Sequence, residues 1–175
     1  MKIGQYKKFI ERILTSELPR LALQDLYYQL MDEGLTPQES FRVLRDIYWQ
    51  NKRQLNQKEI TEESIREMGN QIEKFHPHKD ALCKAVLAKD GGKSLVMEME
   101  RLSNEGLLKL DIYKIFLELF SYVQYREYIH HDFQEHHYDL IADYILDGLW
   151  GGGWDKGNRL LPDELDVCDL INKKD

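Results

Sequence analysis

Apolar residues recur every three or four positions along most of the chain, and this spacing constrains the fold more than any other feature of the sequence. It places the apolar side chains of a segment on one face of an α-helix. The spacing predicts a first helix over about residues 3–15 and a last one over about residues 133–149. No segment alternates apolar and polar residues as a half-buried strand would. The sequence therefore predicts an all-α bundle of antiparallel helical hairpins, with about seven helices and little or no sheet.

Residues that begin and end helices support this prediction. In Thr36-Pro37-Gln38-Glu39, Thr36 is expected to be the N-cap of a helix and Glu39 to complete a capping box. A proline in the first turn loses no hydrogen bond. Gly91-Gly92 is expected to end a short helix, and Ser94 to cap the next one.

A faint internal repeat is visible at an offset of 72 residues. Glu33-Gly34-Leu35 matches Glu105-Gly106-Leu107, and each triplet lies between two predicted helices. Apolar positions match at the same offset, among them Leu30 with Leu102, Leu44 with Phe116, and Ile47 with Leu119. One interpretation is a true repeat of a helical hairpin. The other is that any two amphipathic hairpins match this well, and the sequence leaves both open.

The length of 175 residues and the hydrophobic share of 42 % fit one globular domain with a real core. We expect this domain to cover residues 1–161, followed by an acidic, partly flexible tail over residues 162–175. No apolar run approaches the roughly 20 residues that cross a bilayer, and the N-terminus is amphipathic, unlike a secretory signal. Cys83 and Cys168 are too few and too far apart for a disulfide framework. These features predict a soluble, cytoplasmic protein without a membrane partner.

The net charge of −7 is concentrated near the C-terminus. Residues 132–175 contain 11 acidic and 4 basic residues, whereas acids and bases balance over the first 131. This asymmetry argues against nucleic acid as a partner of the acidic region. It favours a basic protein partner.

The acidic residues of the last predicted helix are the main candidates for a binding site. Glu135, Asp139, Asp143 and Asp147 follow one another at steps of four, beside Asp132, with no lysine or arginine before Lys156. Like charges at this spacing destabilise a helix by roughly 0.2–0.5 kcal/mol per pair. A base on another helix, a basic partner or a metal would compensate them, and an ordinary solvated acidic face is the alternative.

Two tryptophans flank the glycines that follow this helix. Tryptophan is a favoured anchor at protein interfaces, although Trp150 and Trp154 would equally pin a turning tail to the body of the protein. The predicted partner-binding residues are Asp132, Glu135, Asp139, Asp143, Asp147, Trp150 and Trp154.

Histidines in the same region raise the question of a metal. His131 and Glu135 are four residues apart, a spacing that can place two ligands on one helical face, and His130, His136 and His137 lie beside them. Glu-x-x-His, a motif of di-iron bundles, occurs twice, as Glu73 to His76 and as Glu127 to His130. Both residue types are common, and surface histidines are the simpler interpretation. We therefore expect neither a metal nor another cofactor.

A helix–turn–helix interpretation applies to residues 21–55. The second helix of this segment carries Arg42, Arg45, Lys52 and Arg53. Glu39 and Asp46 lie among these bases, whereas recognition helices normally sit in a basic footprint. The sequence contains no G-x-S-x-G motif, and neither cysteine has an evident base near it, so we expect no catalytic residues.

Taken together, these patterns predict a small, acidic, non-enzymatic protein that binds a basic protein partner. An immunity protein or antitoxin that covers a nuclease-like toxin has these properties, because opposite potentials steer encounter. Two alternatives stay open. One is a metal-dependent helical-bundle enzyme using the His/Asp/Glu cluster, and the other is a helical DNA-binding regulator.

Overall fold

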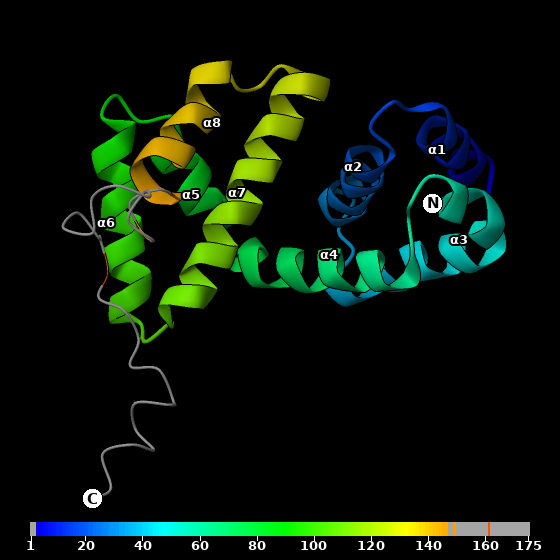
Figure 1. Cartoon of the computed structure of the whole chain (residues 1–175), viewed down its shortest axis with the longest axis horizontal. Helices are drawn as coiled ribbons and strands as arrows, with labels where there is room; N and C mark the ends of the chain where they lie inside the picture. The colour runs from blue at the N-terminus through cyan, green and yellow to red at the C-terminus, as the bar shows by residue number, and fades with distance from the viewer. Residues whose placement is uncertain (1–2, 147–148, 150–160, 162–175) are drawn as a thin grey trace, which may run out of the picture. The chain divides into compact units, whose positions relative to one another are not determined.

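The computed structural model describes residues 3–146, 149 and 161, and within them the chain consists of helices joined by short turns (Figure 1). Eight α-helices, one 3-10 turn and one π-helical turn account for the regular structure of these residues, which include no strand. The predicted all-α fold is confirmed. The chain divides into two compact units, residues 1–76 and residues 77–175.

The first unit contains four helices, α1 (Ile3–Thr15), α2 (Pro19–Asp32), α3 (Pro37–Gln57) and α4 (Glu62–Phe75). The predicted capping box at the start of α3 is confirmed. The Glu39 backbone N–H donates to Thr36 Oγ1 at 3.2 Å, and the Thr36 N–H donates to Glu39 Oε2 at 2.9 Å. These bonds satisfy backbone donors that the first helical turn leaves without a partner.

Consecutive helices of the first unit pack on one another around α2, which is buried over most of its length. Leu26, Leu30, Leu44 and Phe75 are inaccessible to solvent. The helix also buries a charge, because Asp25 Oδ2 lies 2.7 Å from a guanidinium nitrogen of Arg12 on α1. Apolar burial and this ion pair together hold α1 against α2.

The second unit contains α5 (Lys79–Val86), α6 (Gly91–Asn104), α7 (Lys109–His130) and α8 (Glu135–Ile141), followed by a π-helical turn over Ala142–Leu146. The 3-10 turn His76–His78 precedes α5. The predicted last helix over residues 133–149 is therefore wrong in detail, because the α-helix begins at Glu135 and changes to π geometry after Ile141.

The start of α6 corrects another prediction. The helix begins at Gly91 with Asp90 as its N-cap residue, so Ser94 lies inside the helix and does not cap it. Gly91 is buried, and a Cβ atom at this position would lie 2.8 Å from Leu140 Cδ2 and 2.9 Å from the Val86 carbonyl oxygen. The glycine therefore allows the close approach of three helices, and it does not act as a helix breaker here.

The structure supports a repeat at the predicted offset of 72 residues. Helices α2 and α6 both have 14 residues, and α6 begins and ends 72 positions after α2. Helix α7 also begins 72 positions after α3. The two units thus share not only a sequence pattern but also helix boundaries.

The turns between these helices have the same hydrogen bonds. In the first unit the Leu35 N–H donates to the Leu30 oxygen and the Gly34 N–H to the Met31 oxygen, at 3.1 and 2.9 Å. In the second, the equivalent bonds from Leu107 and Gly106 are 3.2 and 3.0 Å long. Both are Schellman caps, whose glycines adopt the left-handed conformation at φ +96° (Gly34) and +91° (Gly106).

The correspondence extends to α4 and α8 with an offset of 73, because α7 is one residue longer than α3. Helix α4 begins with a capping box made by Thr61 and Ser64, and α8 has one of the two bonds of such a box, from the Gln134 N–H to the His137 side chain. Buried apolar residues match at this offset, namely Ile60 with Phe133, Met68 with Ile141, and Ile72 with Ile145. The correspondence thus covers three consecutive helices of each unit, whereas α1 and α5 differ in length and offset.

The expected single domain over residues 1–161 stays a prediction, since two compact units of one chain can still unfold together. The expected tail, residues 162–175, lies outside the described residues. Among the helices of the described part, none is long and apolar enough to cross a membrane.

Candidate functional site: the acidic face of α8

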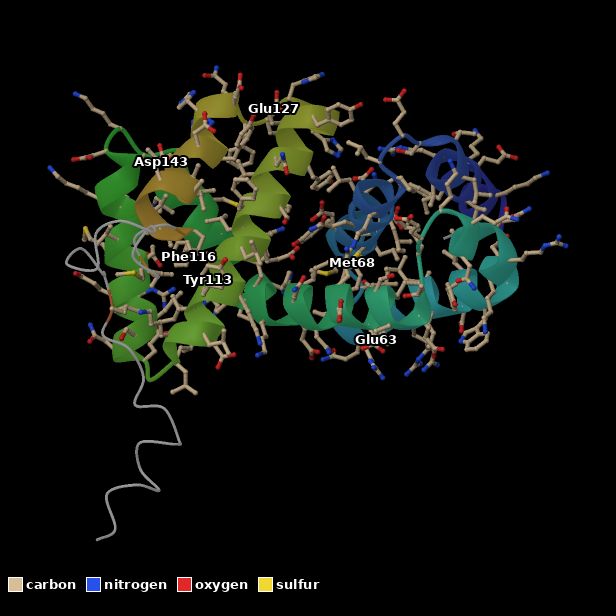
Figure 2. All side chains as sticks on the ribbon, in the orientation of Figure 1. Glu63, Met68, Tyr113, Phe116, Glu127 and Asp143 are labelled. Atoms are coloured by element: carbon tan, nitrogen blue, oxygen red, sulfur yellow. The ribbon has the colours of Figure 1, made fainter. Side chains whose placement is uncertain are left out.

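The end of α7 and the start of α8 position the acidic residues. Helix α7 stops at His131, which has the left-handed φ of 56° and donates its N–H to the Glu127 oxygen at 3.2 Å. Three residues later the Gln134 N–H donates to Nδ1 of His137 at 2.9 Å and so caps α8. Figure 2 shows Glu127 on α7 and Asp143 beyond α8, both in the second unit.

The apolar side of α8 fixes which of its faces is exposed. Ile141 and Ile145 are inaccessible to solvent, and the Tyr138 ring meets the Phe120 ring edge-on with centroids 5.8 Å apart. With these side chains turned inward, Glu135, Asp139 and Asp143 are exposed. We call these three residues the acidic face.

Asp132 differs from the acidic face because its charge is compensated within the protein. Its carboxylate forms an ion pair with Arg126 of α7, across the turn between the two helices. Of the predicted partner-binding residues, Asp132 thus has an internal role that the sequence analysis did not assign to it.

The acidic face itself has little internal compensation. The Tyr138 phenol lies beside the acidic face. Partial burial is the main cause that raises the pKa of Tyr138, and the negative charges of Glu135 and Asp139 raise it further. Neither Asp139 nor Asp143 forms an ion pair with any of the residues that the structure describes. The carboxylates that the sequence predicted to need an external base therefore remain directed to solvent.

Comparison with α4 shows that this helix forms without acids at the positions of Asp139 and Asp143, although Glu62 matches Glu135. At the offset of 73, Arg66 of α4 occupies the position of Asp139, and Asn70 occupies that of Asp143. Arg66 forms an ion pair with Glu63 on the same helix. A helix in the equivalent place of the first unit thus mixes both signs of charge, whereas the exposed residues of α8 are two acids and His136, with no lysine or arginine.

The histidines around α8 have structural contacts. The Tyr125 hydroxyl lies 3.1 Å from Nε2 of His130. The ring centroids of His136 and His137 lie 4.0 Å apart. Burial is the main cause that lowers the pKa of His137, and the neighbouring His136 lowers it further. Within the described part of the chain, no three side chains of His, Cys, Asp or Glu come together as metal ligands would.

The remaining predicted partner-binding residues, Asp147, Trp150 and Trp154, lie outside the described residues. Sequence reasoning missed Arg126 and Tyr138 as neighbours of the acidic residues. Tyr138 could have been found from the sequence, because Glu135 and Tyr138 are three residues apart on one predicted helix.

Comparison of the chain with protein-family models, with curated proteins and with solved structures found no match.

Proposed function

We propose that this chain is a non-enzymatic binding protein whose acidic face on α8 binds a basic protein partner. The observation that carries the proposal is the exposure of Glu135, Asp139 and Asp143 along one helix, with no ion pair to Asp139 or Asp143 among the described residues. A helix that keeps repulsive charges one turn apart loses a few tenths of a kcal/mol for each pair. A basic partner would turn this repulsion into attraction.

The placement of the charges suits recognition by electrostatic complementarity. Acidic residues gathered on α8 and on the π-helical turn that follows it create a local negative potential, which raises the rate of encounter with a positively charged surface. Proteins that act on nucleic acids carry such positive surfaces, because they bind phosphates. We therefore favour a nuclease-like toxin as the partner, covered by this chain in the manner of an immunity protein or antitoxin.

A differential capture experiment tests this proposal. The bait is the full chain, and the comparison bait carries Glu135→Gln, Asp139→Asn and Asp143→Asn, which keep side-chain shape and remove the charge. We expect a basic protein to be retained by the wild type and lost from the variant, and its nuclease activity to fall when the wild-type chain is added. Identical capture by both baits, or selective capture of acidic proteins, would contradict the proposal.

A further inference from the structure

The exposed face of α3 has the opposite charge. Arg42 and Arg45 are exposed before Trp49, and Lys52 and Arg53 are exposed after it, beyond a kink at Asn51, whose φ is −122°. Trp49 exposes 49 % of its surface, so a partner could contact its indole ring. Asp46 is the one acidic residue in this face of the helix. We call these four cations and Trp49 the basic face.

Trp49 is held in a defined position. Its ring contacts the Tyr48 ring edge-on, with centroids 5.6 Å apart, and the Lys52 ammonium lies 4.5 Å from its centroid. A cation over an indole ring at this distance is attracted by the ring electrons. The indole is thus ordered before binding, which lowers the entropy lost when a partner contacts it.

A cavity opens beside the basic face, between α3 and α4. Its volume is about 130 Å³, and its apolar lining comes from Phe41, Tyr48 and Ile65. Arg45, Arg66 and Glu62 complete the lining. A cavity of roughly 150 Å³ holds a benzene molecule, so this one matches a single aliphatic side chain in size.

Contacts within the described part of the chain do not explain the four cations of the basic face or the exposed Trp49. Among the described residues, Arg42, Arg45, Lys52 and Arg53 form no ion pair. At the offset of 72, Lys114 of α7 keeps the charge of Arg42, whereas Leu117, Ser121, Gln124 and Tyr125 replace the other three cations and Trp49 with uncharged residues that have no indole. Helix α7 therefore forms without a basic face, as α4 forms without acids at the positions of Asp139 and Asp143.

We propose that the basic face of α3 binds an acidic polypeptide segment, which inserts one aliphatic side chain into the cavity between α3 and α4. The four cations complement the carboxylates of such a segment, and tryptophan and arginine are the residues that dominate binding energy at protein interfaces. A polypeptide fits better than a nucleic acid. The apolar side chains of the cavity suit an aliphatic side chain of a peptide, and Lys52 already covers one side of the Trp49 ring, on which a base of a single strand would stack.

A displayed library of random peptides tests this inference on the full chain. Selection uses the wild type, with counter-selection on Trp49→Ala and on Arg45→Glu, two exposed positions whose variants are first shown to have wild-type circular dichroism. We expect enrichment of peptides that combine several acidic residues with one leucine, isoleucine, valine or methionine. An enriched peptide should lose roughly tenfold or more in affinity with either variant, and should keep its affinity with the matched control Lys84→Glu on α5.

Three results would overturn the inference. The first is the absence of enrichment over the counter-selected variants. The second is enrichment of neutral or basic peptides, or of acidic peptides whose aliphatic residue can be changed to serine without loss of affinity. The third is tighter binding of a single-stranded oligo-dT than of the enriched peptide, lost with the same two variants, which would assign the basic face to nucleic acid.

Discussion

Substitution of Gly91 by alanine tests the close packing that positions α8. The new Cβ atom would lie 2.8 Å from Leu140 Cδ2 and 2.9 Å from the Val86 carbonyl oxygen. The leucine side chain can rotate, but the carbonyl belongs to the backbone of α5, so the start of α6 must shift. Overpacking of this kind costs about 1–3 kcal/mol, and the better helix propensity of alanine offsets at most about 1 kcal/mol of it.

Taking the middle of the overpacking range less the full propensity gain, we expect Gly91→Ala to lower the free energy of unfolding by about 1 kcal/mol, equivalent to roughly 2–4 °C in melting temperature for a chain of this size. The assay is urea unfolding followed by circular dichroism. Leu140→Ala provides the control in a double-mutant cycle, since removing Leu140 Cδ2 should make the combined loss smaller than the sum of the single losses. Unchanged or increased stability of Gly91→Ala, or strict additivity in the cycle, would refute the packing argument.

Three further predictions concern caps and titrating groups. Thr36→Ala should lower unfolding free energy by about 1 kcal/mol, because the α3 cap is lost; an unchanged urea midpoint would contradict this. Burial and the neighbouring His136 lower the pKa of His137, so the folded chain favours the neutral imidazole. The contribution of His137 to the free energy of unfolding is therefore complete above the ordinary histidine pKa of about 6.5, and it is lost as the pH falls through the folded-state pKa. His137→Gln keeps a capping side chain, and melting curves at several pH values should show a flatter pH dependence than the wild type; equal slopes would contradict the assignment. Burial raises the pKa of Cys83 to about 11. In a Cys168→Ser variant, iodoacetamide should therefore label the native chain at pH 8 far more slowly than the urea-unfolded chain. Equal labelling rates would refute the burial of this thiol.

Local signals in the sequence were sufficient for the bounds of the first helix and for the start of α3. The Thr36–Glu39 capping box and the two Glu-Gly-Leu turns were identified correctly, because a cap or a Schellman turn depends on residues only a few positions apart. The same reasoning failed at Gly91, where the glycine responds to Leu140 and Val86. A contact with a residue far along the chain, such as Leu140, cannot be recognised from the neighbouring sequence. The sequence therefore predicted the end of a helix at Gly91.

The extent of the repeat and the pairing of charges were also beyond the sequence. The match of α4 with α8 was hidden by the extra residue of α7, which changes the offset from 72 to 73. The Arg126–Asp132 pair spans a turn whose course depends on the left-handed backbone of His131. Spacing on a continuous helix does not reveal such a contact, whereas it correctly indicated that Glu135, Asp139 and Asp143 share an exposed face.

The most direct test of the proposed function compares stability with association for one variant. The triple change Glu135→Gln, Asp139→Asn and Asp143→Asn removes charge without removing any ion pair of Asp139 or Asp143 within the described part of the chain. A control with Glu59, Glu62 and Glu67 changed to glutamine removes the same charge from the first unit, at exposed positions.

The measurement is the melting temperature of both variants, together with their association rate with the basic protein captured by the wild type. We expect the triple variant to keep its stability or to gain at most about 1 kcal/mol, and to associate more slowly than the control. Wild-type association should also slow as salt rises, because the Debye length falls to about 3 Å at 1 M. A clear loss of stability with an unchanged association rate would show that the acidic face is an internal electrostatic contact, which contradicts its assignment as a recognition surface.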